Sequence, residues 1–339
     1  MSYEAQDVER KVLSILRVLN DSQKPVGARV IAHRLTEYGI DLSERAVRYH
    51  LKMTDERGLT QLVGRRHGRF LTEPGLEEIE SALVKDKIGF ALSRIELLAF
   101  RTNFDCKSRS GLVPVNISFF PKDRFPKALK AMKPAFDAGL CVSELVAVAS
   151  EGQRLGDLLV PRGQVGFATV CSIIVNGCFL KAGIPMDSRF GGVLQVRNRK
   201  PLRFVELIHY AGSSLDPSEI FIRARMTSVT GVALKGSGKV LANFREIPSI
   251  SRSVAETVVE RLRESGMKGQ LVMGNVSEAI CEVPVEPNKI GIVLLGGMNP
   301  VAAAEEADIG AANQAMSTLM DYRQLIRFSE LFERAVDPK

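Results

Sequence analysis

The sequence lacks the features that mark several large classes of protein. No apolar run approaches the ~20 residues that a membrane helix needs, and the opening segment MSYEAQDVERK has no apolar signal-peptide core. Five cysteines are scattered along the chain without a CxxC pair, which argues against a zinc knuckle and against a disulfide framework. We therefore expect a cytoplasmic protein that does not contact the membrane and has reduced, mostly buried thiols.

Catalytic signatures are also missing. The sequence contains no Walker loop, no GxSxG elbow and no HExxH pair. Of only four histidines, His33, His50 and His67 lie near the N-terminus without metal-ligand spacing, and His209 stands alone in the rest of the chain. The sequence therefore predicts no catalytic residue, no bound metal and no cofactor, and it favours a sensor over an enzyme.

Length and charge indicate more than one domain and a basic N-terminal part. The 339 residues suffice for two or three domains of ~100–200 residues each. Residues 1–72 carry 13 Lys and Arg against 9 Asp and Glu, a net charge of +4, and the remaining 267 carry 33 against 30, a net charge of +3. More than half of the positive excess thus lies near the N-terminus, where it would attract a polyanion.

The first 85 residues have the pattern of a winged helix-turn-helix. Apolar residues recur with helical spacing over three segments, 7–20, 28–38 and 43–57. Gly39 and Gly58 are placed to end the second and third helices, and Ser43, or Asp41 before it, can cap the third. Two short strands follow, over 60–63 and 69–72. Three helices and a basic hairpin predict a DNA-binding domain over residues 1–85.

The third of these helices carries the strongest chemical signal. Four residues share one of its faces at i, i+3, i+4 and i+7, namely Arg45, Arg48, Tyr49 and Lys52. In a major groove, Arg can bond guanine bidentately, while Lys and Tyr can reach phosphates. The hairpin adds the residues of a wing, Arg65, Arg66, His67 and Arg69. With Ser43 these residues predict an interface with double-stranded DNA; a solvated charged face, RNA binding and a protein-docking winged helix are the alternatives.

The rest of the chain contains an internal duplication. Gly, Val, Asn and Pro stand in register between residues 111–121 and 238–248, a shift of 238 − 111 = 127. Later segments continue the match, and the shift is 124 where 203–207 resembles 327–331. Such self-similarity predicts two similarly folded halves related by a pseudo-twofold axis.

The fold class is therefore α+β/α/β multidomain, with the winged helix-turn-helix followed by an internally duplicated α/β regulatory domain. Short strands alternate with helices in each half, as in mixed-sheet units. We place the parts at 86–110 for a connecting segment, 111–235 for the first half and 236–335 for the second. The first half carries an insertion that runs from a charged loop at 185–192 to strand-like runs at 208–210 and 220–222.

Two Gly/Asn turns occupy matching places in the halves, each between an apolar strand and a helix. Asn176 and Gly177 form the first, and Gly296, Gly297 and Asn299 form the second. Free backbone N–H groups at a helix start can bind a small anionic metabolite. The charged loop adds Asp187, Ser188 and Arg189, of which the arginine suits a carboxylate. Glycines needed only for tight turns, and a loop that serves a dimer interface, are the alternatives.

These segments together resemble the NrpR-type nitrogen repressors of methanogenic archaea and their bacterial relatives. The likeness covers nearly the whole chain and is most specific over 181–192 and 243–248, with further matches at 42–51, 93–96, 170–173, 203–207 and 212–216. The resemblance implies a homodimeric repressor of nitrogen-assimilation genes that binds a palindromic operator and is released by the effector 2-oxoglutarate. Some family members carry two sensor domains, whereas this chain carries one.

The working hypothesis is that paired sensor domains set the separation of two winged helices, and that ligand binding changes this separation. The rival interpretation is a metabolite-binding enzyme that uses its winged helix as a docking module. An activator or an RNA binder is a third possibility.

Overall fold

The computed structural model describes residues 3–22, 25–37, 40–64, 68–81 and 89–336. The chain divides into two compact units, Met1–Ile88 and Gly89–Lys339. In the part of the chain described, no helix combines the length and the apolarity needed to cross a bilayer.

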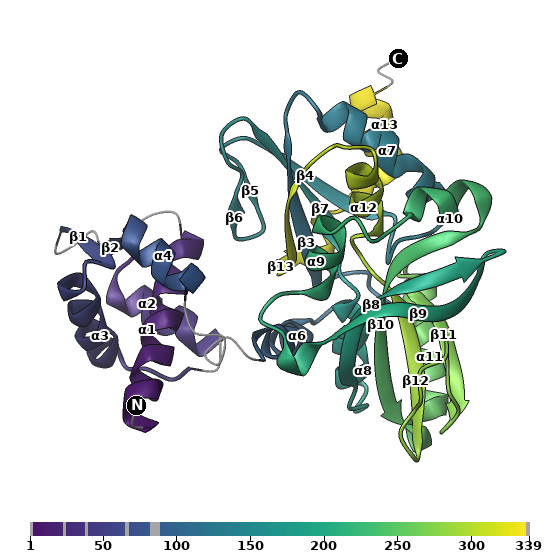
Figure 1. The fold of residues 1–339 in the computed structure, drawn as a ribbon, viewed down its shortest axis with the longest axis horizontal. Coiled ribbons are helices and arrows are strands. Elements are labelled where there is room, and N and C mark those ends of the chain that lie inside the picture. The colour runs from purple at the N-terminus through teal and green to yellow at the C-terminus, as the bar shows by residue number, and fades with distance from the viewer. Residues whose placement is uncertain (1–2, 23–24, 38–39, 65–67, 82–88, 337–339) are drawn as a thin grey trace. The chain divides into compact units, whose positions relative to one another are not determined.

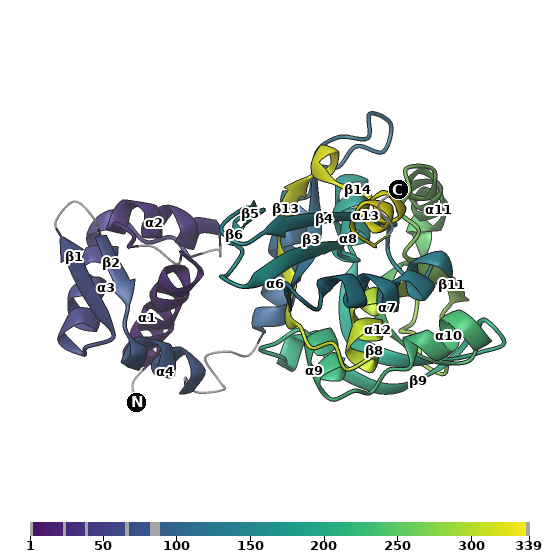
Figure 2. The same ribbon diagram turned by 90° about the horizontal axis from the view of Figure 1, so that it is seen from above.

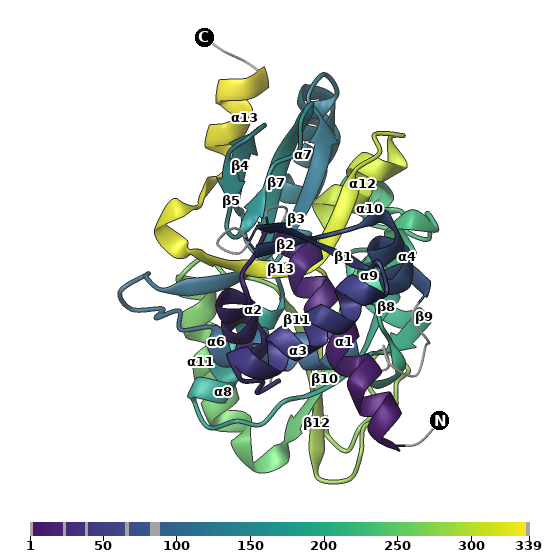
Figure 3. The same ribbon diagram turned by 90° about the vertical axis from the view of Figure 1, so that its left-hand side faces the viewer.

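The N-terminal unit is a winged helix, as the sequence predicts. Its elements are α1 (Tyr3–Ser22), α2 (Ala28–Glu37), α3 (Glu44–Glu56), β1 (Thr60–Gly64), β2 (Gly68–Leu71) and α4 (Glu73–Ser81). The first three helices pack around a core that includes Ile15, Ile31 and Leu51, and the antiparallel β1–β2 hairpin follows them (Figures 1 and 3). The apolar faces that the sequence periodicity predicts are thus buried between these elements.

The regulatory unit combines helices with two five-stranded sheets. Its main helices are α6 (Phe90–Arg101), α7 (Phe125–Asp137), α8 (Ile173–Lys181), α9 (Pro217–Arg223), α10 (Val229–Lys235), α11 (Arg252–Glu264), α12 (Asn299–Glu306) and α13 (Phe328–Val336). Short 3₁₀ turns lie at η1 (Tyr210–Gly212), η2 (Ser249–Ser251) and η3 (Tyr322–Gln324).

The first sheet has the strand order β13-β3-β7-β4-β14 and the second has the order β11-β12-β10-β8-β9. The strands of the first are β3 (Leu112–Pro121), β4 (Leu145–Ser150), β7 (Gln164–Val170), β13 (Ala312–Asp321) and β14 (Ile326–Arg327). Those of the second are β8 (Asp187–Arg197), β9 (Lys200–His209), β10 (Gly238–Pro248), β11 (Gln270–Val276) and β12 (Lys289–Leu295). A small hairpin is formed by β5 (Arg154–Leu155) and β6 (Leu158–Leu159).

Each half follows the βαββαβ order of a ferredoxin-like unit, but the halves exchange their last strands. The run β3-α7-β4-β7-α8 is followed by β8, which pairs with β10 of the second half. The run β10-α11-β11-β12-α12 is followed by β13, which pairs with β3 of the first half. The duplication therefore folds as one interlocked unit. The expectation of mixed sheets is wrong, because the strand pairs in both sheets are antiparallel.

The two largest apolar cores of the unit each contain side chains from both sheets. One contains α7 and α12, which pack side by side (Figures 1 and 2). The other contains α8 and α11. Each core thus contains helices from both halves, so neither half could bury its apolar surface alone.

Several local expectations are corrected by this architecture. Residues 90–101, placed in the connecting segment, form α6 and pack against α8 and β13. The charged loop expected at 185–192 is mostly the strand β8. The strand expected at 220–222 lies in α9, which Asp216 caps by accepting a hydrogen bond from the N–H of Ser218 at 2.8 Å.

Candidate functional site

The exposed face of α3 presents the residues that the sequence singled out. Val47, His50, Leu51 and Thr54 are buried, whereas Arg45, Arg48, Tyr49 and Lys52 are exposed. Arg48 pairs with Glu44, and Lys52 lies 3.8 Å from Glu56, in both cases one turn along the helix. Exposed pairs of this kind contribute ~0.3–0.5 kcal/mol each, so the cations can exchange these partners for phosphates at little cost.

Two other residues predicted to contact DNA have structural roles within the winged helix. Ser43 is the N-cap of α3 and accepts a hydrogen bond from the N–H of Ala46 at 3.2 Å. Arg69 donates from Nε to Asp55 at 2.7 Å, and Asp55 also accepts from the hydroxyl of Thr60. Arg69 therefore fastens the hairpin to α3. Arg65, Arg66 and His67 lie outside the described residues.

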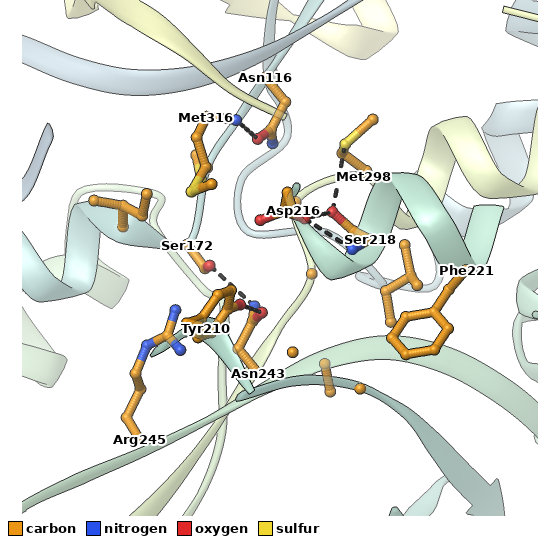
Figure 4. Close-up of a pocket in the computed structure, with 18 residues that line it drawn as sticks. Asn116, Ser172, Tyr210, Asp216, Ser218, Phe221, Asn243, Arg245, Met298 and Met316 are labelled. Atoms are coloured by element: carbon orange, nitrogen blue, oxygen red, sulfur yellow. Dashed lines mark hydrogen bonds between the residues drawn. The ribbon is translucent and has the colours of Figure 1, made fainter. Parts of the chain in front are cut away.

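A pocket lies where the two halves of the regulatory unit meet (Figure 4). Its walls include matching pieces of the duplication. Asn116 and Asn243 are related by the shift of 127, and Cys171–Ile173 and Gly296–Met298 follow the equivalent strands β7 and β12. The insertion in the first half supplies an asymmetric wall with Tyr210 and Asp216. The pocket is thus pseudo-symmetric in backbone but not in side chains.

Arg245 supplies a buried positive charge to this pocket. Its residue surface is only 1% exposed, and its Nε is buried without a hydrogen-bond partner. The guanidinium lies over the ring of Tyr210, 4.8 Å from the centroid, and Nη1 makes one long hydrogen bond, 3.4 Å, to the carbonyl of Phe244. A buried cation with unused donors is costly unless an anion joins it.

A chain of hydrogen bonds holds the polar side chains around this cation (Figure 4). The hydroxyl of Tyr210 donates to Asn243 Oδ1 at 2.5 Å, and Asn243 Nδ2 donates to Ser172 Oγ at 3.1 Å. On the other half, Asn116 Oδ1 accepts from the N–H of Met316 at 3.0 Å. These contacts fix the orientation of both asparagine amides, so the polar groups of the pocket are set before a ligand arrives.

The glycines after β12 allow the backbone to approach the pocket closely. A Cβ on Gly297 would lie 2.3 Å from the carbonyl oxygen of Val170, and one on Gly296 would lie 2.7 Å from the Cβ of Leu241. The N–H of Gly296 donates to Leu241. Within the described residues, the N–H groups of Gly297 and Met298 at the start of α12 have no hydrogen-bond acceptor. This is the free-amide arrangement that the sequence predicts for the second turn.

The first predicted turn is wrong in position. Asn176 and Gly177 lie inside α8, not ahead of it. Asn176 donates a hydrogen bond from Nδ2 to Ser188 Oγ at 3.0 Å. A Cβ on Gly177 would lie 2.5 Å from the Cβ of Thr102, the residue that caps the C-terminus of α6. Both residues therefore pack elements together, and neither lines the pocket.

Replacing Gly177 with alanine is expected to lower the free energy of unfolding by about 1–3 kcal/mol, because the added methyl overlaps Thr102 and the surroundings must shift. Urea unfolding measures the change. Gly310→Ala is the control, since a Cβ there meets nothing within 4 Å. Equal stability of the two variants would contradict the packing role.

The remaining predicted ligand residues also lie outside the pocket lining. Arg189 contacts Glu286 at 2.5 Å, Glu246 at 3.4 Å and Asp187 at 3.3 Å, so its guanidinium already has carboxylate partners. Asn299 is fully buried and exchanges two hydrogen bonds with the backbone of Leu241. Of the predicted set, Gly296 and Gly297 line the pocket.

The functional candidates that sequence reasoning missed are Arg245, Tyr210 and Asp216. Arg245 lies in the segment 243–248 that carries the family resemblance, and its counterpart in the first half is Ser118. An arginine that occurs in only one copy of the duplicated strand therefore marks this position as a candidate functional residue. Burial raises the pKa of Asp216, and the hydrogen bonds from Ser218 and the positive charge of Arg245 oppose that rise. Burial also raises the pKa of the Cys171 thiol to about 12, which keeps it protonated.

Glu219 ties the insertion to the exchanged strand and should make stability depend on pH. It accepts a hydrogen bond from the N–H of Ala315 at 2.7 Å, and burial raises its pKa from 4.5 to about 7. The folded chain then holds more protons than the unfolded chain between these two values, so stability falls as pH rises through that window.

We expect Glu219→Gln to remove most of this dependence, because glutamine keeps the acceptor oxygen without the charge. Urea unfolding at about pH 5 and about pH 7.5 measures it. The variant should gain stability over wild type at the higher pH and differ less at the lower. Parallel pH profiles for the two proteins would contradict the assignment.

Among the described residues no group of three potential metal ligands is found. The five cysteines are free thiols, and Cys141, Cys171 and Cys178 are buried.

A winged helix with an exposed basic face, followed by a separate unit with its own pocket, is the arrangement of a transcription regulator. The comparisons with known proteins define it further. The family model described as NrpR regulatory domains NRD1 and 2 matches residues 88–327, and the Ribonuclease R winged-helix domain matches residues 13–79. The chain belongs to the NrpR family.

The curated relatives are named as regulators. The global nitrogen regulator NrpRI of Methanosarcina mazei is 42% identical over 94% of this chain and 98% of that protein. The global nitrogen regulator NrpR of Methanococcus maripaludis is 35% identical over 89% of this chain and 53% of its own length; this chain thus spans about half of that relative. The rival interpretation as an enzyme is therefore wrong, and the chain is a regulator.

A solved structure agrees with the fold. The nitrogen repressor-like protein of Methanococcus jannaschii has a TM-score of 0.60 and 26% identity, covering 71% of this chain and 99% of that one.

Proposed function

We propose that this chain is a homodimeric repressor of nitrogen-assimilation genes, which binds a palindromic operator through α3 and is released by 2-oxoglutarate. The names of the relatives support the nitrogen-regulating part. The α3 face supports DNA binding, since its cations and Tyr49 are exposed and held only by weak pairs. Cytoplasmic location follows from this function.

The observation that carries the effector proposal is the buried, under-bonded guanidinium of Arg245. A carboxylate is its natural partner, because two oxygens can accept from two guanidinium N–H groups at once. The second carboxylate of a dicarboxylate can take the free amides of Gly297 and Met298 at the start of α12. The hydroxyls and amides between them suit a keto oxygen.

The size of the pocket links ligand binding to a change of shape. Its cavity volume is about 20 Å³, far below the ~300–1,000 Å³ of pockets that hold small ligands. The residues that line the pocket must therefore move apart to admit a ligand of ten heavy atoms. These residues come from both halves and from the exchanged strands β8 and β13. In the proposed dimer such a movement changes the separation of the two winged helices, so that both half-sites no longer fit.

The direct test measures binding to promoter DNA with and without millimolar 2-oxoglutarate, by fluorescence anisotropy. We expect the operator affinity to fall by about 5- to 150-fold with the ligand, and sedimentation to give a dimer. Unchanged affinity would remove 2-oxoglutarate from the proposal, whereas a monomer bound to one half-site would remove the spacing mechanism. Genomic footprinting identifies the operator and separates a repressor from an activator.

A further inference from the structure

A second basic surface lies on the regulatory unit, at the tip of the β8–β9 hairpin. No Asp or Glu occurs between residues 188 and 205. We define the hairpin cluster as the six exposed cations Arg197, Arg199, Lys200, Arg203, Lys235 and Lys239. None of them belongs to the pocket or to the winged helix.

The fold brings these six residues together from four elements, β8, β9, α10 and β10, and from the β8–β9 turn. Arg197 pairs with Lys200 across the hairpin, and the two-residue turn between them is Asn198–Arg199. The N–H of Arg199 donates to the carbonyl of Gly236 at 2.8 Å, which fixes the tip against the end of α10. Lys239 stands opposite Gln195 of β8. Figures 1 and 2 show α10 beside this end of the hairpin.

Almost no negative charge compensates the cluster. Its one ion pair within the described residues joins Arg203 to Glu282 at 3.9 Å, and both side chains are about half exposed or more. Like charges gathered in this way repel one another, and a mixed surface would be more stable. The fold itself does not require these six positive charges.

The turn itself carries a cation where glycine would be easier. Asn198 and Arg199 have φ of 52° and 62°, the positive pair of a type I′ turn, in which Asn-Gly is strongly preferred. The positive φ of Arg199 thus raises the conformational energy of the folded backbone. This strain and the repulsion among the clustered charges together indicate a binding partner that compensates for both.

We propose that the hairpin cluster is a second DNA contact, which binds the phosphate backbone and places Arg199 at a minor groove. A basic β-hairpin is a shape that fits a groove, and Arg and Lys neutralise phosphates independently of sequence. The proposal rests on the proposed DNA-binding function. An acidic protein or RNA as the partner is an outcome that the test distinguishes.

The test uses the full chain and a labelled DNA duplex of arbitrary sequence, about 30 base pairs long, titrated at salt concentrations from about 50 to 200 mM. The variant combines Arg199→Gly with Lys200→Gln. Because Asn-Gly suits the turn, the hairpin is kept while two charges are lost. The matched control, Arg263→Gln with Lys268→Gln, removes two charges from a mixed surface, where these residues face Glu260 and Glu144.

We expect the hairpin variant to reduce the slope of log affinity against log salt by about two and to weaken binding about tenfold or more, while the control stays close to wild type. An unchanged slope in the hairpin variant, or an equal loss in the control, would overturn the proposal. In that case wild type still binds DNA and the α3 function stands. No binding by wild type would instead overturn the DNA-binding function on which the proposal rests. Duplex RNA and an acidic polypeptide serve as competitors, and a preference for either overturns DNA as the partner.

Discussion

Replacing Arg245 with methionine is expected to abolish the response to 2-oxoglutarate and to leave the ligand-free protein folded. Removing one partner of a buried, hydrogen-bonded charge pair costs about 2–5 kcal/mol of binding free energy, so the affinity for the ligand should fall by roughly 30-fold to several thousandfold. Methionine keeps most of the side-chain volume, and the lost guanidinium has one long hydrogen bond and one ring contact. The melting temperature without ligand should therefore equal or exceed that of wild type.

The matched control is the same substitution at Arg189. That guanidinium binds Glu286, Glu246 and Asp187 away from the pocket, so Arg189→Met should lose stability and keep the ligand. Calorimetric titration and thermal unfolding give the two readouts for both variants. The reverse pattern, with ligand lost in Arg189→Met and kept in Arg245→Met, would move the effector site to the charged cluster around Glu246.

The double variant Arg45→Ala and Arg48→Ala is expected to weaken operator binding at least ~30-fold, since each arginine bound to a guanine contributes about 1–3 kcal/mol. The slope of log affinity against log salt should fall by about two if both side chains also reach phosphates. Both residues are exposed and alanine favours a helix, so the domain should stay as stable as wild type.

Arg57→Ala is the control for this result. Arg57 follows α3 directly and pairs with Glu9 and Glu78, each at 3.0 Å. Its loss should lower stability slightly and leave DNA binding unchanged. If the double variant bound operator DNA as wild type does, α3 would not be the recognition helix.

The winged helix was accessible from the sequence because its elements are specified locally. The apolar stripe of α3, the cap at Ser43 and the glycine after Arg57 are encoded within a few residues of one another. Periodicity alone then separates the buried Val47 and Leu51 from the exposed Arg45 and Arg48. The duplication was accessible too, since strands of equal role kept the same residues in register.

The exchange of β8 and β13 could not be predicted from the sequence in this way. Both strands would pair equally well with the edge of their own half or of the other, because the halves resemble each other. The pairing depends on which arrangement lets α7 meet α12 and α8 meet α11 in two shared cores. Such contacts join residues at least 71 positions apart, and no local pattern encodes them.

The choice between Arg189 and Arg245 shows the same limit at the level of one residue. Both arginines lie in paired strands, and the sequence favoured Arg189. In the structure Phe244 stands opposite Phe190 and Arg245 opposite Ser188, so the register skips Arg189. A β-bulge re-aims side chains on the strand that carries the extra residue. Arg189 is already paired with Asp187, Glu246 and Glu286. Arg245 is buried against Tyr210, and its Nε has no hydrogen-bond partner. This difference arises only once two distant strands are paired.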